Sequence, residues 1–199
     1  MRLADGIAEL GLTLPTGAEA RLEAFMALLA KWNKSYNLTA IRDPDQMVTH
    51  HLLDSLAVLP HLGAAETLAD VGSGAGLPGL TLAMARPELR ITSVEASQKK
   101  VAFQQQAKIE FKLTNVSIHC GRVERLKGTF DAVISRAFSD LAEFVRLAGH
   151  LTGRLLAMKG AYPGTEIEGL PTGWRLAEAI KLNVPGLAAE RHLLILERT

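Results

Sequence analysis

The sequence has only one cysteine, Cys120, and therefore cannot form a disulfide bond within the chain. It also lacks an apolar run of the roughly 18 residues that a membrane-spanning helix needs. Its first residues carry acidic groups instead of the basic-then-apolar pattern of a secretion signal. We therefore expect a cytoplasmic protein that binds no membrane. Because Cys120 falls in a stretch expected to be a buried strand, we interpret it as a core residue and not as a nucleophile.

Metal-binding motifs are missing as well. The sequence contains neither C-x-x-C nor H-E-x-x-H. His50 and Asp54 would lie one turn apart on a helix, but no third ligand accompanies them. We therefore expect no metal site and favour packing or RNA contact as the role of these two residues.

The net charge is only +1, which argues against a general binder of polyanions. The charges are unevenly distributed, however. Residues 97–160 hold eleven lysines and arginines against five acidic residues, whereas residues 1–60 hold five against seven. This local excess indicates a basic surface that can contact nucleic acid, although the same side chains could also form a merely solvated face. The candidates for backbone contacts are Lys99, Lys100, Arg122, Arg125, Lys127 and Lys159.

The first sixty residues have the apolar periodicity of helices. Residues 18–32 place large apolar side chains three and four positions apart, which predicts an amphipathic helix. Residues 44–59 predict a second helix, with Pro44 in its first turn and Pro60 just past its end. We therefore interpret residues 1–62 as a helical extension.

Beyond residue 62 the pattern changes to short β-branched runs that alternate with helical stretches. This alternation predicts an α/β fold over residues 63–199, with a doubly wound, mostly parallel sheet covered by helices on both faces. Two final runs, 174–185 and 191–197, have no helix between them and predict an antiparallel pair at one edge. The other expected strands are residues 67–71, 91–95, 116–120, 130–135 and 154–159, with helices near 78–86, 97–111, 122–127 and 139–150.

A glycine-rich segment, DVGSGAGLPG at residues 70–79, follows the first expected strand and opens the next helix. Gly72, Gly74 and Gly76 permit positive φ angles and let the backbone approach a ligand closely. A dinucleotide fingerprint would require glycine at position 77, where this sequence has Leu77. The G-x-G-x-G spacing after an acidic residue resembles instead the first motif of class I S-adenosylmethionine-dependent methyltransferases. In that class an antiparallel pair of strands commonly closes the parallel sheet.

Glu95 ends the next expected strand, nineteen residues after Gly76. A carboxylate at this place can accept hydrogen bonds from both hydroxyls of a ribose. Because dinucleotide and S-adenosylmethionine sites share this chemistry, Glu95 predicts a ribose without choosing between the two cofactors.

Segments outside the glycine-rich turn form a second and more specific pattern: KWNKSYNLT (31–39), RDP (42–44), HLLDS (51–55), SRAF (135–138), KG (159–160), VP (184–185) and ERH (190–192). Together with the turn, they resemble the bacterial 16S ribosomal RNA guanine-N7 methyltransferases, the RsmG or glucose-inhibited division protein B family. The resemblance implies S-adenosyl-L-methionine as cofactor and methyl transfer to N7 of guanine 527, in the 530 loop of 16S rRNA. The implied partner is the small ribosomal subunit, to which we expect the protein to bind as a monomer.

The resemblance also implies roles for individual residues. Val123 and Glu124 would follow the third strand and lie near the adenine. Arg136 would follow the fourth strand at the mouth of the active site, where it is the candidate for a catalytic residue. The full set of expected cofactor-binding residues is Gly72, Gly74, Gly76, Leu77, Glu95, Val123, Glu124 and Arg136.

The implied reaction needs no general base, because guanine N7 carries an in-plane lone pair and can accept a methyl group without first losing a proton. Catalysis would then rest on alignment of the reacting atoms. Three alternatives stay open at this point. They are a small-molecule methyltransferase with the same cofactor site, a non-enzymatic ribosome-assembly factor that binds RNA, and a dehydrogenase, against which Leu77 argues.

Overall fold

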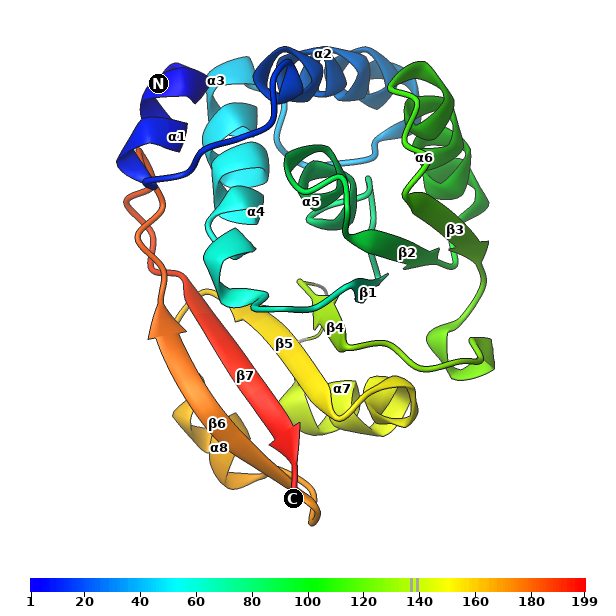
Figure 1. Ribbon diagram of the computed structural model, residues 1–199, viewed down its shortest axis with the longest axis vertical. Helices are drawn as coiled ribbons and strands as arrows, with labels where there is room; N and C mark the ends of the chain where they lie inside the picture. Colours follow the sequence, from blue (N-terminus) through cyan, green and yellow to red (C-terminus); the bar gives the residue numbers. More distant parts are fainter. Residues whose placement is uncertain (137, 139) are drawn as a thin grey trace.

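The computed structural model describes residues 1–136, 138 and 140–199. Within this part of the chain, seven strands form one sheet in the order β3-β2-β1-β4-β5-β7-β6 (Figure 1). The first five strands run parallel to one another, whereas β7 lies antiparallel between β5 and β6. The strands are β1 Thr67–Val71, β2 Arg90–Glu95, β3 Val116–Cys120, β4 Ala132–Ser135, β5 Arg154–Lys159, β6 Trp174–Lys181 and β7 His192–Arg198.

Helices cover both faces of the sheet. α5 and α6 lie on one face with α2 across them, and α7 lies on the other (Figure 1). The helices that precede the sheet are α1 Leu3–Glu9, α2 Ala18–Tyr36, α3 Pro44–Met47, the π-helix η1 Val48–Leu53, α4 Asp54–Leu56 and the 3-10 turn η2 Leu59–His61. Those within it are α5 Gly79–Ala85, α6 Gln98–Glu110, η3 Val123–Arg125, α7 Leu141–Ala148, η4 Gly149–Leu151 and α8 Gly164–Glu168.

The strands alternate between two apolar cores, as the period of two in a strand requires. Leu68 and Leu156 point into the core beneath α2, α5 and α6. Their neighbours Ala69 and Leu155 point into the smaller core beneath α7. The doubly wound, mostly parallel sheet with an antiparallel edge pair is therefore confirmed.

Several details differ from the expectations. The segment 122–127 forms only the short turn η3, and α8 was not predicted at all. Cys120 is exposed, so its interpretation as a core residue was wrong. The physical reason is that β3 is an edge strand and Cys120 is its last residue, where no further strand covers it. The beginning of the helix expected at 139–150 falls on Ser139, which lies outside the described residues.

The helix expected over residues 44–59 is interrupted in the structure. Asp43 caps its start, because its carboxylate accepts the N–H groups of Asp45 and Gln46 at 2.8 and 3.1 Å. The middle then widens into the π-helix η1, and the run ends at Leu56. Pro60 lies inside η2 rather than past the helix end. Single π-helical turns are rare and frequently lie at functional sites.

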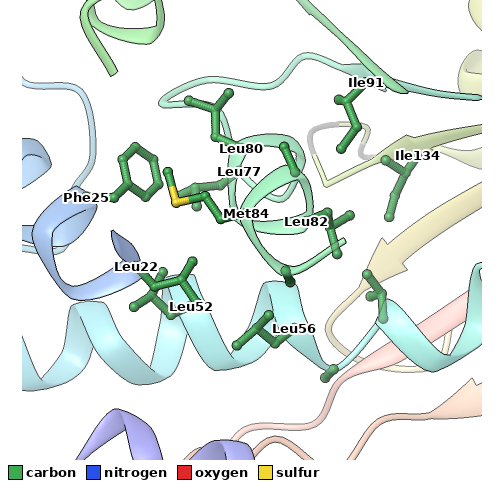
Figure 2. Close-up of a cluster of buried hydrophobic side chains, with 14 of the residues drawn as sticks. Leu22, Phe25, Leu52, Leu56, Leu77, Leu80, Leu82, Met84, Ile91 and Ile134 are labelled. Atoms are coloured by element: carbon green, nitrogen blue, oxygen red, sulfur yellow. The ribbon is translucent and has the colours of Figure 1, made fainter. Parts of the chain in front are cut away.

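The helical extension shares its apolar core with the sheet. Phe25 of α2 is fully buried and stacks on Phe103 of α6, with ring centroids 5.9 Å apart. It also meets the edge of Phe111 at 6.1 Å. Figure 2 shows Phe25 beside Met84 of α5 and near Leu77. The extension is thus packed as tightly as the rest of the molecule.

Replacing Phe25 by alanine should therefore destabilise the whole protein. Loss of a buried phenylalanine costs about 3–5 kcal/mol in the free energy of unfolding, which urea denaturation would measure. As a control, Ile109→Ala removes a side chain that is 72% exposed and should change stability by less than about 0.5 kcal/mol. Equal, small effects of both variants would show that α2 is not part of the core.

Candidate active site

The glycine-rich turn joins β1 to α5 and is fastened to the end of β2. The φ angles of Gly72, Gly74 and Gly76 are 68°, 58° and 82°, a region that favours glycine. The amides of Gly72 and Ser73 both donate to the carbonyl oxygen of Val94, at 3.0 and 3.2 Å. The strand β2 therefore holds the turn open at the carboxyl edge of the sheet, where ligands of such folds bind.

A cavity of about 230 Å³ lies between the turn and the ends of β2 and β3. Four of the expected cofactor residues line it: Gly72, Glu95, Val123 and Glu124. Val123 is buried and provides an apolar wall, whereas Glu124 is exposed. An apolar wall beside the carboxylates of Glu95 and Glu124 suits an adenosine, so the residues present fit this part of S-adenosylmethionine.

Glu95 has two tasks at this cavity. Its Oε2 accepts the N–H of Gly74 at 2.8 Å, and its Oε1 accepts the N–H of Ser97 at 2.8 Å. Each carboxylate oxygen can accept a second hydrogen bond. Glu95 can therefore hold the turn and still accept the hydroxyls of a ribose.

A second cavity, of about 200 Å³, shares Gly72 with the first. Gly74, Leu77 and Arg136 line it, which brings three more of the expected residues together. Gly76 does not line either cavity. A Cβ at this position would lie 2.5 Å from Leu80, so the structure explains this glycine by the packing of the turn against α5.

A third and larger cavity, of about 410 Å³, shares Thr39, His51 and Arg136 with the second. The sequence did not identify it as a site. Its wall combines parts of the chain that are far apart: the loop after α2, the helix turns η1 and α4, and the ends of β4, β5 and the segment before β7. The three cavities thus adjoin one another, because the first and second share Gly72 and the second and third share Thr39, His51 and Arg136.

A buried carboxylate organises the third cavity. Asp54 accepts hydrogen bonds from Arg136 at 3.2 Å and from Arg191 at 2.9 Å, and its side chain is only 2% exposed. Arg136 also donates to the carbonyl oxygen of His50 at 3.1 Å. The carboxylate of Asp54 is thus bound to two guanidinium groups within the protein. Among the described residues, no group of acidic, histidine or cysteine side chains could hold a metal ion.

His51 is buried at the junction of the second and third cavities. Its Nε2 lies 3.0 Å from the hydroxyl of Thr39. The pKa of His51 is lowered to about 4, mainly because the ring is buried and secondly because Arg136 carries a positive charge nearby. The ring is therefore neutral at physiological pH and cannot add a charge to the cavity.

The basic residues singled out in the sequence divide into two groups. Lys159 is bound to Glu166 at 2.7 Å and also donates to the carbonyl oxygen of Phe138 at 3.2 Å. It lines the third cavity but is engaged within the protein. Arg122, Arg125 and Lys127 are exposed beside η3, as is Lys99 on α6, whereas Lys100 is half-buried. Of the segment SRAF, Ala137 lies outside the described residues.

The fold and the hollow define a class of protein. A parallel sheet closed by an antiparallel strand, a glycine-rich turn after β1 and a carboxylate at the tip of β2 are the features of class I S-adenosylmethionine-dependent methyltransferases. A family model described as "GidB: rRNA small subunit methyltransferase G" matches residues 18–194. The chain belongs to this family and is an S-adenosylmethionine-dependent ribosomal RNA methyltransferase.

Individual relatives agree with this assignment. The chain is 60% identical to ribosomal RNA small subunit methyltransferase G of Aromatoleum aromaticum, over 98% of this chain and 97% of the relative. It is 59% identical to the protein of the same name from Azoarcus sp. strain BH72, over 99% and 95%. Among solved structures, a SAM-dependent methyltransferase from Aquifex aeolicus superposes with a TM-score of 0.59 at 17% identity, covering 84% of this chain and 97% of that one.

A second buried carboxylate, Asp70, lies at the end of β1. Its Oδ2 accepts the N–H of Gly79 at 2.8 Å, while its Oδ1 has no partner among the described residues. Burial raises the pKa of Asp70 to about 7, although the Gly79 hydrogen bond and the charge of Arg136 both act against this. Asp70 is therefore partly protonated near neutral pH, directly beneath the cofactor turn.

This carboxyl should make stability depend on pH. The folded protein holds the Asp70 proton up to about pH 7, whereas the unfolded chain releases it near 3.8. The stabilising contribution of Asp70 therefore decreases as pH rises through this window, by up to about 1.4 kcal/mol per pH unit. His51 acts in the opposite sense, since its contribution is lost as pH falls from 6.5 towards 4.

Asp70→Asn should remove only the first of these contributions. Relative to wild type, the variant should gain in free energy of unfolding as pH rises from 5 to 7, measured by urea denaturation at each pH. The control is Asp131→Asn, because the pKa of the exposed Asp131 is lowered by hydrogen bonds from Glu66 and Thr67 and its titration falls below this range. A difference between Asp70→Asn and wild type that stays constant from pH 5 to 7 would contradict the protonation of Asp70.

Proposed function

We propose that this protein transfers a methyl group from S-adenosyl-L-methionine to N7 of guanine 527 in 16S rRNA. The observation that carries this proposal is that the three cavities lie next to one another. Two of them are lined by all of the expected cofactor residues except Gly76, and the third lies beside them with a volume of about 410 Å³. In this proposal the third cavity receives the target base.

Within this proposal, the first cavity holds the adenosine and the second holds the amino-acid part of the cofactor. Glu95 would bind the ribose, while Val123 and Glu124 would flank the adenine. Gly72, Gly74 and Leu77 would pack against the remainder of the cofactor. When bound, S-adenosylmethionine supplies an electrophilic methyl group on a sulfonium centre.

The described residues suit a reaction that removes no proton. Guanine N7 would accept the methyl group with its own lone pair, so no side chain of this protein would have to remove a proton. With a pKa of about 4 His51 is a weak base, and Asp54 is bound to two guanidinium groups, so both residues suit the positioning of groups in the cavity. The main task of the site is to align the base with the methyl group and to exclude water.

Charge at the third cavity supports a nucleic acid as the acceptor. Arg136, Lys159 and Arg191 line it, and the only carboxylate among its lining residues is Asp54. Because Lys159 is paired with Glu166, the two arginines exceed Asp54 by one positive charge, which favours an acceptor that carries phosphates. We propose that the exposed cations Lys99, Arg122, Arg125 and Lys127 extend this surface toward the RNA backbone. A small neutral acceptor would gain no electrostatic attraction from these cations.

We further propose that residues 1–62 serve as an extension that builds the acceptor site. Thr39, Ala40 and Ile41 come from the loop after α2, and His51 and Asp54 come from the helical run behind it. Asn33 holds the loop, since it accepts the N–H of Thr39 at 2.9 Å. We expect the protein to act as a monomer on the small ribosomal subunit. No helix in the described part of the chain is long and apolar enough to cross a membrane.

A methyl-transfer assay would test the proposed activity directly. The acceptors to compare are 30S subunits, naked 16S rRNA and free guanosine, followed by mapping of the modified nucleotide. We expect 7-methylguanine at position 527 with at least one of the two RNA substrates. Transfer to guanosine alone would support a small-molecule enzyme, and RNA binding without transfer would support an assembly factor.

Gly72→Val should abolish binding of S-adenosylmethionine, as measured by calorimetry. A β-branched side chain would fill space in both cofactor cavities and would be strained at φ 68°. Gly11→Val is the matched control, because Gly11 has a φ of 67° and a Cβ there would touch nothing within 4 Å. Wild-type affinity in the Gly72 variant would remove this residue from the cofactor site.

Arg136→Lys should lower the rate of methyl transfer by about 10²-fold, the usual effect of removing one preorganised donor from an active site. Lysine keeps a positive charge beside Asp54, so the buried carboxylate stays neutralised and stability changes less than in an alanine variant. Arg146→Lys serves as the control, because Arg146 is exposed and pairs only with Glu143 among the described residues. Unchanged turnover at saturating substrates in the Arg136 variant would exclude it from catalysis.

A further inference from the structure

Gln104 is a polar residue in an apolar setting. It is fully buried on the inner side of α6, next to the buried residues Phe103 and Ala107. A primary amide at such a place costs free energy unless its hydrogen bonds are satisfied. Gln104 lies one helical turn before the buried Ala107, and nothing at this position in the sequence indicates a functional role.

The amide of Gln104 is fully engaged with the cofactor turn and β2. Its Oε1 accepts the hydroxyl of Ser93 at 2.6 Å. Its Nε2 donates to the hydroxyl oxygen of Ser73 and to the carbonyl oxygen of Gly74, both at 2.8 Å. Because the Gly74 carbonyl can only accept, these bonds fix which end of the amide faces the turn.

The main chain at Gly74 is therefore held from two sides. Its N–H is bound by Glu95 of β2, and its C=O is bound by Gln104 of α6. In a trans peptide the C=O and the following N–H point in opposite directions. The carbonyl points inward to α6, so the N–H of Ala75 points to the other side of the peptide. Both Gly74 and Ala75 line the second cavity, and no acceptor among the described residues takes the Ala75 N–H.

We propose that Gln104 is a positioning residue for the cofactor, because it sets the Gly74–Ala75 peptide so that the Ala75 N–H faces the second cavity. An N–H aimed there can donate to the carboxylate of the amino-acid part of S-adenosylmethionine. This inference rests on the proposed placement of the cofactor, with adenosine in the first cavity and the amino acid in the second. Gln104 itself touches no reacting atom.

The principal test is calorimetric affinity with two ligands. Gln104→Met keeps the length of the side chain but removes its donors, and Gln104→Glu keeps its shape but faces the Gly74 carbonyl with an acceptor. S-adenosylmethionine should bind about tenfold more weakly to the methionine variant and more weakly still to the glutamate variant, since each leaves a buried carbonyl unsatisfied. Methylthioadenosine lacks the amino-acid carboxylate, and its affinity should change by less than about twofold.

The controls separate positioning from simple packing. Gln106→Met changes an exposed neighbour on the same helix, bonded only to Glu110 among the described residues, and should leave both affinities unchanged. Ser93→Ala removes only the hydroxyl that orients the Gln104 amide. It should weaken the binding of S-adenosylmethionine by about threefold, with little loss of stability. Saturating cofactor should restore the turnover of every folded variant.

Several outcomes would overturn the proposal. An equal loss of affinity for both ligands in Gln104→Met would mean that the residue supports the turn as a whole. Unchanged affinity with a lower melting temperature would mean that it only packs. If the Gln104 variants do not fold, unchanged affinity in Ser93→Ala would overturn the proposal in their place. If wild-type protein bound methylthioadenosine but not S-adenosylmethionine, the proposed function would fail instead, and the two failures are thus distinguishable.

Discussion

The third cavity, which we propose as the acceptor site of this methyltransferase, depends on one buried carboxylate. Asp54 is almost inaccessible to solvent and is neutralised by Arg136 and Arg191, which come from the end of β4 and the segment before β7. A buried charge is tolerated only while its partners stay in place. The same ion-pair cluster therefore fixes three distant parts of the chain and sets the positive wall of the third cavity. Removing either arginine would alter shape and charge together.

The glycine-rich turn is also held by contacts from neighbouring elements, which here come from neutral groups and one carboxylate. The turn after β1 has few side chains of its own, so neighbouring elements must fix its conformation. β2 does this through the Val94 carbonyl and Glu95, and α6 does it through Gln104. Glycine gives the turn access to its ligand, and the surrounding hydrogen bonds remove the freedom that glycine introduces. Cofactor and acceptor sides then meet at Arg136 and His51.

Sequence patterns were sufficient for the fold, and the structure places most of the expected cofactor residues around two adjoining cavities. Strand runs such as 67–71 and 154–159 matched to the residue, because buried parallel strands have continuous apolar sequences. The cofactor residues are local in sequence or lie at strand ends, which spacing can reveal. The pairing of Asp54 with Arg191 spans 137 positions, and no periodicity encodes it. Cys120 was misjudged because a sequence does not show which strand lies at the sheet edge, and Gln104 was missed because nothing in the pattern of its helix marks it as buried.

The order of these elements along the chain has a consequence for biosynthesis. The turn after β1, Glu95 and η3 leave the translating ribosome well before the segment that carries Arg191. A nascent chain can therefore assemble the nucleoside-binding half while Asp54 still lacks its second guanidinium. The acceptor half becomes complete only after β7 is made and inserted beside β5. The proposed acceptor site is thus completed late in synthesis, once β7 has been inserted between β5 and β6.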